Sequence, residues 1–397
     1  YIEFLSNMLT SISNNPKPLK GMVIVIDYGS GTTGFIRELF EKLGAEVIGI
    51  LPDPNPEFPI HMPDPNEPEN LALLRHYIKE LNAQPQYKNR TIVGIAFDTD
   101  GDRVGFVTGT SAVCSGSYLL AVLAQGACAE KQGNSILFNC RACPALVPLV
   151  ESIGGRPVWG HTGYANLRKD MKKEAKRLEQ EDPEYVVAWG GEDSGHVLFP
   201  DNYYFDDGMY TACKVLVALS KTGKDLDALS KLPPHQMMKE ARMKINARET
   251  DVPEIRERIL GAIGETFKSQ GNLMEERSSQ LDGPRSLVPQ GQAQVYTLVR
   301  SSLHEPILCM SIASLADETA HQTDTQLLTN VLSQAKHMKE LLSTFPELDA
   351  SAVDKSIEDL EARMGSSPVG NDSREYVLTQ RRLLGVMVER ADILGIE

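Results

Sequence analysis

The chain has 397 residues, a length that suggests two to four domains. Its content of 41% hydrophobic and 24% charged residues is ordinary for a globular protein, and no apolar run is long enough to predict a transmembrane helix. The net charge of −14 argues against a protein that coats nucleic acid, so we expect neither nucleic-acid nor membrane binding, although a local basic pocket for a phosphorylated metabolite is compatible with it.

The six cysteines and the first residues bear on where the protein functions. The cysteines are scattered in apolar or small-residue contexts without a disulfide framework, which favours a reduced, cytoplasmic environment. Cys140 and Cys143 form a CxxC, for which buried thiols and a metal or redox role are the two alternatives. The sequence begins at Tyr1 and no signal-peptide pattern follows, so we expect the sequence to start inside a longer protein.

The first hundred residues alternate apolar strands with amphipathic helices. Residues 1–20 contain a helix and a Pro/Lys turn, and residues 22–26 are a short apolar strand. A glycine-rich turn at 27–34 leads into a helix at 35–43, and a second strand follows at 46–50. This order predicts a right-handed βαβ unit on a mostly parallel sheet.

A second pass of the same order begins near Asn134. Before it come a proline-rich loop at 52–68, a helix at 69–81, a strand at 91–97 and a helix at 118–129. The second pass predicts strands and helices in alternation, at 135–139, 145–153, 157–159, 167–180 and 185–189, after which come residues 208–219 and a charged stretch to about residue 248. The repeated order suggests a duplicated α/β domain.

The later residues have a different pattern. Alternating segments at 294–299 and 307–313 indicate a smaller α+β domain, and residues 324–397 are helical and polar. We therefore predict an α/β fold, with two consecutive mixed or parallel-sheet α/β domains followed by a smaller α+β domain and a helical C-terminal tail. The predicted boundaries are 1–130, 131–248, 249–322 and 323–397.

Three aspartates follow the strand at 91–97. Asp98, Asp100 and Asp102 recur at a spacing of two, which sends their side chains the same way in a locally extended backbone. A divalent cation would relieve the repulsion among three carboxylates, and ligation by oxygen alone suits magnesium. A calcium EF-hand fails, because Arg103 stands where glycine is needed and Gly109 where glutamate is needed. A solvated acidic turn is the simpler alternative.

Residues 95–103 resemble the metal loop of the α-D-phosphohexomutase superfamily. Residues 27–31, 58–65 and 68–71 are similar to segments of that family's second domain. The resemblance implies that Asp98, Asp100 and Asp102 hold Mg²⁺. It also implies that Arg103 is catalytic, lying beside a phosphoserine and stabilising charge during phosphoryl transfer.

Residues 189–196 resemble the sugar-recognition loop in the third domain of the same family. By this resemblance Glu192, Ser194 and His196 bind substrate, and the chemistry fits, because a carboxylate and a hydroxyl can hydrogen-bond sugar hydroxyls. His196 could equally be a structural partner, and a polar turn is the alternative for the whole loop. The aspartates of residues 205–208 are expected to cap a helix.

Two further segments resemble phosphate-contacting parts of the family. Arg141 stands where a basic phosphate-contacting residue is common. Residues 162–171 are like a loop near the reacting sugar, but Tyr164 replaces a histidine and Arg168 replaces a lysine. Both replacements leave the substrate preference open.

Residues 299–306 resemble the phosphate clamp of the family's fourth domain. Arg300 and Ser302 would bind the phosphate that is not reacting. His304 stands where threonine is typical, and a strand-end loop with one exposed arginine is the alternative.

The resemblance implies a phosphomannomutase/phosphoglucomutase-like enzyme, which interconverts hexose 1-phosphate and hexose 6-phosphate through a phosphoserine and a bisphosphate. No Thr-x-Ser-His-x-Pro loop occurs in the sequence, so we expect the N-terminal phosphoserine domain to be lacking and this chain alone to be inactive. The alternatives are a phosphoglucosamine mutase, an inactive sugar-phosphate-binding paralogue and an unrelated magnesium phosphatase with an aspartyl nucleophile. Hexose phosphates are the expected partners, and the protein is expected to be a monomer or homodimer.

Overall fold

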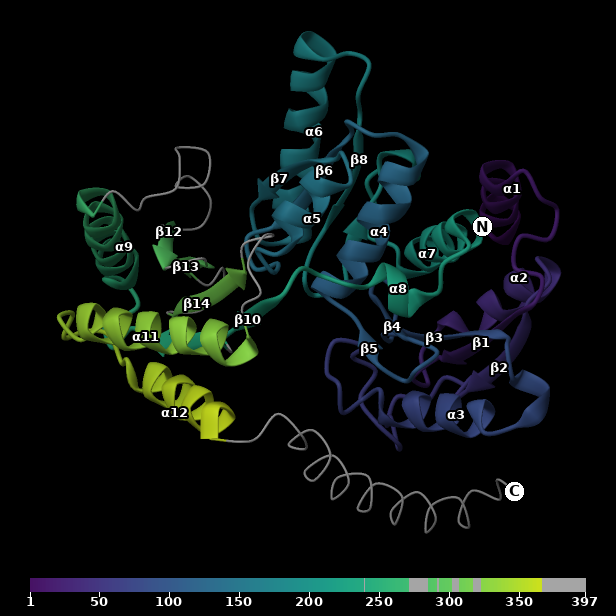
Figure 1. Ribbon diagram of the computed structural model, residues 1–397, viewed down its shortest axis with the longest axis horizontal. Helices are drawn as coiled ribbons and strands as arrows, with labels where there is room; N and C mark the ends of the chain where they lie inside the picture. Colours follow the sequence, from purple (N-terminus) through teal and green to yellow (C-terminus); the bar gives the residue numbers. More distant parts are fainter. Residues whose placement is uncertain (239, 271–284, 291–292, 302–306, 317–322, 366–397) are drawn as a thin grey trace. The chain divides into compact units, whose positions relative to one another are not determined.

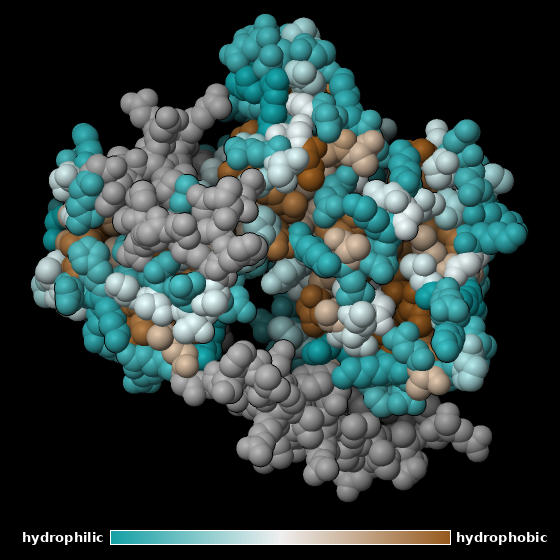
Figure 2. Space-filling model, viewed as in Figure 1, coloured by the Kyte–Doolittle hydropathy of each residue, from teal (hydrophilic) through white to brown (hydrophobic). Residues whose placement is uncertain are grey.

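The computed structural model describes the chain except for residues 239, 271–284, 291–292, 302–306, 317–322 and 366–397 (Figure 1). The chain forms two compact units, Tyr1–Pro233 and Pro234–Glu397. The first holds two mixed α/β sheets and the second an antiparallel sheet with helices, which confirms the predicted fold class. Hydrophilic side chains dominate the face of each unit visible in Figure 2.

The first sheet has the strand order β2-β1-β3-β4-β5. Strands β1 (Met22–Asp27), β2 (Glu46–Ile50) and β3 (Thr91–Phe97) are parallel, whereas β4 (Val104–Val107) and β5 (Val113–Cys114) are antiparallel. All six residues of β1 are buried, as expected for a strand covered on both faces. The predicted βαβ unit is confirmed.

Helices cover both faces of this sheet. The helical elements are α1 (Ile2–Ser13), η1 (Thr33–Phe35), α2 (Ile36–Lys42), α3 (Ala72–Asn82) and η2 (Pro85–Tyr87). Alternate residues of β1 enter two different cores, since Ile24 and Ile26 pack with α1 and α2 whereas Val23 and Val25 pack with α3. This is the two-residue period that a strand imposes on its side chains.

The second sheet has the order β7-β6-β8-β9. Strands β6 (Ser135–Asn139), β7 (Arg156–Gly160) and β8 (Val187–Gly191) are parallel, and the short β9 (Val197–Leu198) is antiparallel to β8. The strand and helix order repeats that of the first sheet, as the sequence predicted.

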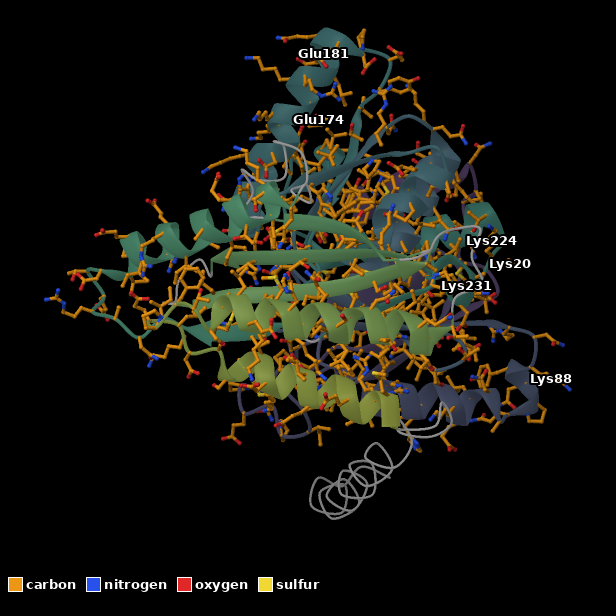
Figure 3. The ribbon with its side chains drawn as sticks, turned by 60° about the vertical axis from the view of Figure 1, so that its left-hand side comes forward. Lys20, Lys88, Glu174, Glu181, Lys224 and Lys231 are labelled. Atoms are coloured by element: carbon orange, nitrogen blue, oxygen red, sulfur yellow. The ribbon has the colours of Figure 1, made fainter. Side chains whose placement is uncertain are left out.

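The helices of the second sheet tie the two sheets together. They are α4 (Ser117–Glu130), α5 (Leu146–Ser152), α6 (Tyr164–Glu181), η3 (Pro200–Asn202), α7 (Gly208–Thr222) and α8 (Leu226–Leu229). Helix α6 packs on one face, while α4, α5 and α7 share the large core that also contains Ile24 of β1 and Trp189 of β8. Charged ends such as Glu181 of α6, and Lys88 after η2, are exposed (Figure 3). One continuous core therefore fixes the two sheets relative to each other.

The second unit contains an antiparallel sheet of the order β10-β14-β13-β12, with β11 also paired to β14. Its strands are β10 (His235–Met237), β11 (Ala241–Lys244), β12 (Arg285–Gln290), β13 (Ala293–Ser301) and β14 (Ile307–Ala316). Strands β10 and β11 precede residue 248 and pair with β14, so contacts divide the chain at Pro233. The predicted domain boundaries stay a prediction.

Among the described residues, the helices that accompany this sheet are α9 (Val252–Ser269), α11 (Asp324–Leu342) and α12 (Ser351–Gly365). Helix α11 starts with a capping box in which Thr323 and Gln326 satisfy each other's backbone N–H. Val331 and Met338 of α11 are fully buried in the same core as Val299 of β13. None of the helices in the described part of the chain is long and apolar enough to cross a bilayer.

Candidate functional site

The three aspartates lie in a turn where the buried strand β3 ends, which we call the aspartate loop (residues 98–103). One carboxylate oxygen from each of Asp98, Asp100 and Asp102 lies within 4.8 Å of the others. Asp98 is buried, Asp100 is exposed and Asp102 is half-buried. The structure thus brings the three carboxylates together, but it does so through a turn with Gly101 at a φ of +81° and not through the extended backbone that the sequence argument assumed.

Hydrogen bonds to Asp98 hold the loop in this shape. Its Oδ1 accepts from the backbone N–H of Gly101 at 3.0 Å and of Arg103 at 3.2 Å, and its Oδ2 accepts from Arg103 Nε at 2.9 Å. Burial, followed by the neighbouring Asp102, raises the pKa of Asp98. The pKa of Asp102 is lowered, chiefly by the nearby His196. The loop therefore contains one carboxylate held by internal donors, the exposed carboxylate of Asp100, and that of Asp102, which lies beside His196.

The donor set fits a hard cation. The three carboxylates offer only oxygen, the ligand that magnesium prefers. Asp102 Oδ1 is buried and accepts no hydrogen bond from the described residues, although Arg103 Nε lies 3.7 Å away. A buried oxygen without a donor is costly, and a cation would satisfy it.

Arg103 joins the aspartate loop to the proline loop (residues 52–68). Besides Asp98, its guanidinium contacts Asp64, with Nη1 and Oδ1 3.3 Å apart. Two residues further along the proline loop, Asn66 Nδ2 donates to the backbone oxygen of Ser194. Asp64 and Asn66 were not singled out from the sequence, because nothing local to them predicts these partners.

Glu192, Ser194 and His196 lie in the glutamate loop (residues 191–196), which joins β8 to β9. Glu192 is buried, and its Oε1 accepts from Asn139 Nδ2 at 2.9 Å and from the Gly163 N–H at 2.8 Å. Its Oε2 lies 3.6 Å from His196 Nδ1, and Ser194 Oγ lies 2.9 Å from the same nitrogen. Glu192 is thus held in one orientation by the ends of β6 and β7.

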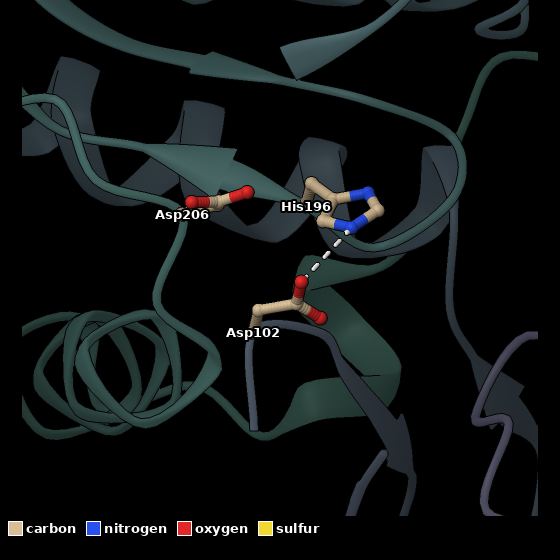
Figure 4. Close-up of side chains that lie close together, drawn as sticks. All are labelled: Asp102, His196 and Asp206. Atoms are coloured by element: carbon tan, nitrogen blue, oxygen red, sulfur yellow. Dashed lines mark ion pairs between the residues drawn. The ribbon is translucent and has the colours of Figure 1, made fainter. Parts of the chain in front are cut away.

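His196 connects the two loops. Its Nε2 lies 3.5 Å from Asp102 Oδ2, and the backbones of Arg103 and His196 form an antiparallel bridge. Asp206 completes a cluster with Asp102 and His196 in which the ligand atoms lie within 4.8 Å of one another (Figure 4). The aspartate loop of the first sheet and the glutamate loop of the second therefore form one site.

Helix α7 begins against this site. The expected helix cap is Asp207, whose Oδ1 accepts from the Tyr210 N–H at 2.9 Å, whereas Asp206 faces His196 instead. The N–H of Gly208 donates to the Gly101 oxygen at 2.9 Å. A Cβ on Gly208 would lie 2.7 Å from the backbone oxygen of Arg103, so this close approach requires glycine.

The two replaced residues on α6 also lie here. The Tyr164 ring is 6.4 Å from the His196 ring, centroid to centroid. The Arg168 guanidinium lies 5.5 Å from the Tyr164 ring and 5.8 Å from the Phe205 ring, and its Nη2 is 4.0 Å from Asp206 Oδ1. Aromatic rings and the Arg168 guanidinium therefore lie along one side of the cluster.

The remaining predicted phosphate contacts, Arg141 and Arg300, differ in how deeply they are buried and in their surroundings. Arg141 is exposed just after β6, at the same carboxyl edge of the sheet as the glutamate loop. Arg300, on β13 in the other unit, is 5% exposed and donates from Nη2 to Glu240 Oε2 at 2.7 Å. Ser302 and His304 lie outside the described residues.

The CxxC follows β6, and Cys140 contacts Thr162. All six cysteines belong to the described residues, are buried and form no disulfide. Cys140 Sγ is 3.1 Å from Thr162 Oγ1, and burial raises the pKa of Cys143 to about 12. A protonated, buried thiol is a poor nucleophile and a poor metal ligand, which favours the interpretation as buried thiols.

Two protein-family models match the sequence. The description "Phosphoglucomutase/phosphomannomutase, alpha/beta/alpha domain II" matches residues 1–111, and that of domain III matches residues 115–236. A phosphomannomutase/phosphoglucomutase of Pseudomonas putida is 31% identical over 333 residues, which cover 83% of this chain and 65% of that protein. The phosphohexose mutases of Xanthomonas campestris include a relative that is 28% identical, covering 83% of this chain and 66% of that protein.

Solved structures resemble the chain in fold. A phosphoglucomutase/phosphomannomutase family protein from Burkholderia thailandensis matches with a TM-score of 0.60 at 26% identity, covering 84% of this chain and 64% of that one. The parafusin phosphoglucomutase of Paramecium matches with a TM-score of 0.57 at 15% identity, covering 86% and 61%, a likeness of fold alone. The chain thus spans just under two thirds of the length of the proteins it resembles.

Proposed function

Since the chain belongs to the phosphoglucomutase/phosphomannomutase family, whose second and third domains it matches, we propose that it carries the metal and sugar sites of a phosphohexomutase. The proposed reaction interconverts hexose 1-phosphate and hexose 6-phosphate, with mannose or glucose as the sugar, through a phosphoserine and a bisphosphate. The observation that carries the proposal is the contact between two motifs 94 residues apart, Asp102 in the aspartate loop and His196 in the glutamate loop (196 − 102 = 94).

Asp98, Asp100 and Asp102 are the proposed ligands of Mg²⁺. Bound there, magnesium supplies positive charge to the oxygens of the phosphoryl group being transferred. Arg103 would act beside it, because its guanidinium is held by Asp98 and Asp64 and so needs little reorganisation to meet negative charge. Holding charged groups in position accounts for most of the catalysis that phosphoryl transfer needs.

Glu192, Ser194 and His196 are the proposed sugar contacts. Glu192 Oε1 is already engaged by two donors, so Oε2, which faces His196, is the oxygen that could accept from a sugar hydroxyl. Arg141, exposed at the same edge of the sheet, is the proposed contact for the substrate phosphate. Arg300 and Ser302 keep the proposed role of a clamp on the phosphate that is not reacting.

The phosphoryl donor is part of the proposal but not of this sequence. No Thr-x-Ser-His-x-Pro segment occurs among the 397 residues, so we expect the chain alone to bind metal and sugar phosphate without turnover. Complete turnover would need a phosphoserine supplied by residues outside this sequence.

An inactive sugar-phosphate-binding paralogue is a second candidate. The observation that favours it is Tyr164, a bulky phenol whose ring lies beside His196 where the family resemblance calls for a histidine. A phenol does not ionise near neutral pH as an imidazole does, so it could bind substrate without taking part in proton transfer.

Calorimetric titration of the intact chain with MgCl₂, and then with mannose, glucose and glucosamine 1-phosphates, tests the proposal. We expect one magnesium site that Asp102→Asn weakens, and sugar-phosphate binding that Glu192→Ala weakens. Glu179→Gln on the exposed side of α6 removes one charge far along the helix and serves as the control. No magnesium uptake by the wild-type chain would refute the proposed metal site.

Turnover separates the two candidates. Phosphorus NMR of this chain joined to the phosphoserine domain of a mutase relative, with a hexose 1-phosphate and a catalytic amount of the matching bisphosphate, would show the 6-phosphate if the protein is a mutase. Binding without any interconversion would favour the inactive paralogue.

A further inference from the structure

The proline loop (residues 52–68) is attached at three places that matter to the proposed site. Asp64 contacts Arg103 of the aspartate loop, and Asn66 Nδ2 donates to the Ser194 oxygen of the glutamate loop. The third attachment is His61, which contacts Asp27 at the end of β1. A single short segment therefore touches both functional loops and is anchored to the first sheet by one histidine.

The hydrogen bonds of His61 determine its protonation. Its Nδ1 lies 2.9 Å from the backbone oxygen of Met62, which can only accept, so Nδ1 carries a hydrogen. Its Nε2 lies 2.9 Å from Asp27 Oδ2, and an ionised carboxylate also only accepts. With Asp27 ionised, both ring nitrogens carry hydrogens, and His61 is a cation paired with Asp27.

The pair formed by His61 and Asp27 is buried in the protein interior. Asp27 is fully buried, its Oδ1 accepts from the Gly29 N–H at 2.9 Å, and the His61 side chain is only 11% exposed. Gly29 has a φ of +56°, and a Cβ there would lie 2.7 Å from Pro63 Cβ, so glycine lets the proline loop close over the end of β1. A charge pair at such a place is costly unless the geometry is well satisfied, which these contacts provide.

We propose that His61 is a positioning residue, which as a cation bound to Asp27 holds the proline loop against Arg103 and the glutamate loop. This inference rests on the proposed function, because Arg103 and Ser194 matter to substrate only if the chain binds sugar phosphates. His61 itself acts through Asp64 and Asn66, which follow Met62 by two and four residues in the sequence.

The charge on His61 responds to pH in a known direction. Burial lowers its pKa, but the hydrogen bond and charge of Asp27 and the Met62 carbonyl raise it further, so the pKa lies above the usual value. Among the described ionisable groups, Asp27 is the one that acts on it, and Asp64 of the same loop is engaged with Arg103. A raised pKa means that the pair is fully formed below about pH 6.5 and is lost as the pH rises through the folded-state pKa.

Nitrogen NMR of the intact chain tests the charge without any substrate. We expect the two ring nitrogens of His61 to show the shifts of a doubly protonated ring at pH 6.5 and to titrate above the value of a free histidine. In His61→Gln the amide signals of Arg103 and Ser194 should shift or broaden. A neutral ring at pH 6.5, or unchanged signals in the variant, would overturn the proposal.

Affinity for glucose 1-phosphate with MgCl₂ tests the consequence. His61→Gln should weaken binding by roughly 10-fold, the lower range for groups that act through a second residue. His76→Gln, the same chemical change on α3, should leave binding unchanged. Asp27→Asn provides a sharper comparison, because the asparagine N–H can donate to a neutral His61 and keep the loop closed without a charge.

The two variants separate charge from hydrogen bonding. The wild-type affinity should fall relative to that of Asp27→Asn as the pH rises from 6.5 to 9, while Asp27→Asn stays flat; parallel pH profiles would refute the role of the charge. If wild-type protein binds no glucose 1-phosphate, the positioning role falls together with the proposed function. The nitrogen titration would then still report whether the ion pair exists.

Discussion

Replacing Asp100 with asparagine should stabilise the metal-free chain while weakening its response to magnesium. Asp100 is exposed, and one of its oxygens lies within 4.8 Å of oxygens of both Asp98 and Asp102. Without a cation these carboxylates repel one another, so the change removes an unfavourable interaction. With a cation the same change removes a ligand. The two effects on stability have opposite signs, so a general change in stability would not produce both.

The magnitude follows from the spacing. Two unit charges about 4.8 Å apart repel by about 0.9 kcal/mol in water and about 3.5 kcal/mol at an effective dielectric of 20. Because Asp100 is exposed, the lower figure applies to each neighbour, and salt screens it further to a total of about 1 kcal/mol. For a folding unit of this size that raises the melting temperature by about 2–4 °C.

Magnesium should act in the other direction. At 100 times the dissociation constant, ligand binding stabilises the wild-type chain by about 2.7 kcal/mol, or about 5–10 °C. Asp100→Asn should show a distinctly smaller increase at the same MgCl₂ concentration, because only two carboxylates remain.

Differential scanning calorimetry with EDTA and with MgCl₂ measures both effects on the same samples. Glu179→Gln on α6 controls for the loss of one negative charge from a chain of net charge −14. If Asp100→Asn melts lower than wild type in EDTA, or keeps the full magnesium shift, the carboxylates do not form the mutually repelling ligand set argued above.

Three further predictions concern stability and reactivity. Glu192→Ala leaves the Asn139 amide and the Gly163 N–H without their buried acceptor, so urea unfolding should show a loss of about 2–4 kcal/mol, most of which Glu192→Gln should restore through its remaining oxygen. Gly208→Ala places a Cβ against the backbone of the aspartate loop and should lower the unfolding free energy by about 1–3 kcal/mol, measured in the same way, whereas Gly261→Ala on α9, where nothing lies within 4 Å, should not destabilise. A colorimetric thiol reagent should react slowly with the native chain and fully after denaturation, because all six cysteines are buried; one fast native thiol would contradict this.

Much of the fold was predictable because its signals are local. Strands β3 and β6 coincide with the predicted 91–97 and 135–139, since continuous apolar runs bounded by turns mark buried parallel strands. Helix α9 was not predicted, although its buried residues Ile259, Ile263 and Phe267 recur at helical spacing after a proline near the helix start. Its charged residues hid that pattern within a segment interpreted as α+β.

In the candidate site, too, contacts between residues close in sequence were predictable and long-range contacts were not. The nearness of Asp98, Asp100 and Asp102 was predictable because the three lie within one short loop, although the loop is a turn closed on Asp98 and not the extended segment that was assumed. The interpretation of both aspartates near residue 206 as helix caps holds for Asp207 but not for Asp206, which lies beside β9 and faces His196. No local pattern distinguishes these two adjacent aspartates, because the contacts that each one makes depend on a loop distant in the sequence.

The amino-acid pattern alone established the α/β class, the family resemblance and the position of the acidic loop, because each depends on residues close together in the chain. Packing of the two sheets around one shared core brought Asp102 to His196 and Asn66 to Ser194, and the fold of the proline loop over the first sheet brought His61 to Asp27. These contacts join residues 34 to 128 positions apart, and they depend on the burial of apolar side chains that holds the sheets together. Such pairings follow from the fold as a whole and leave no mark on either stretch of sequence.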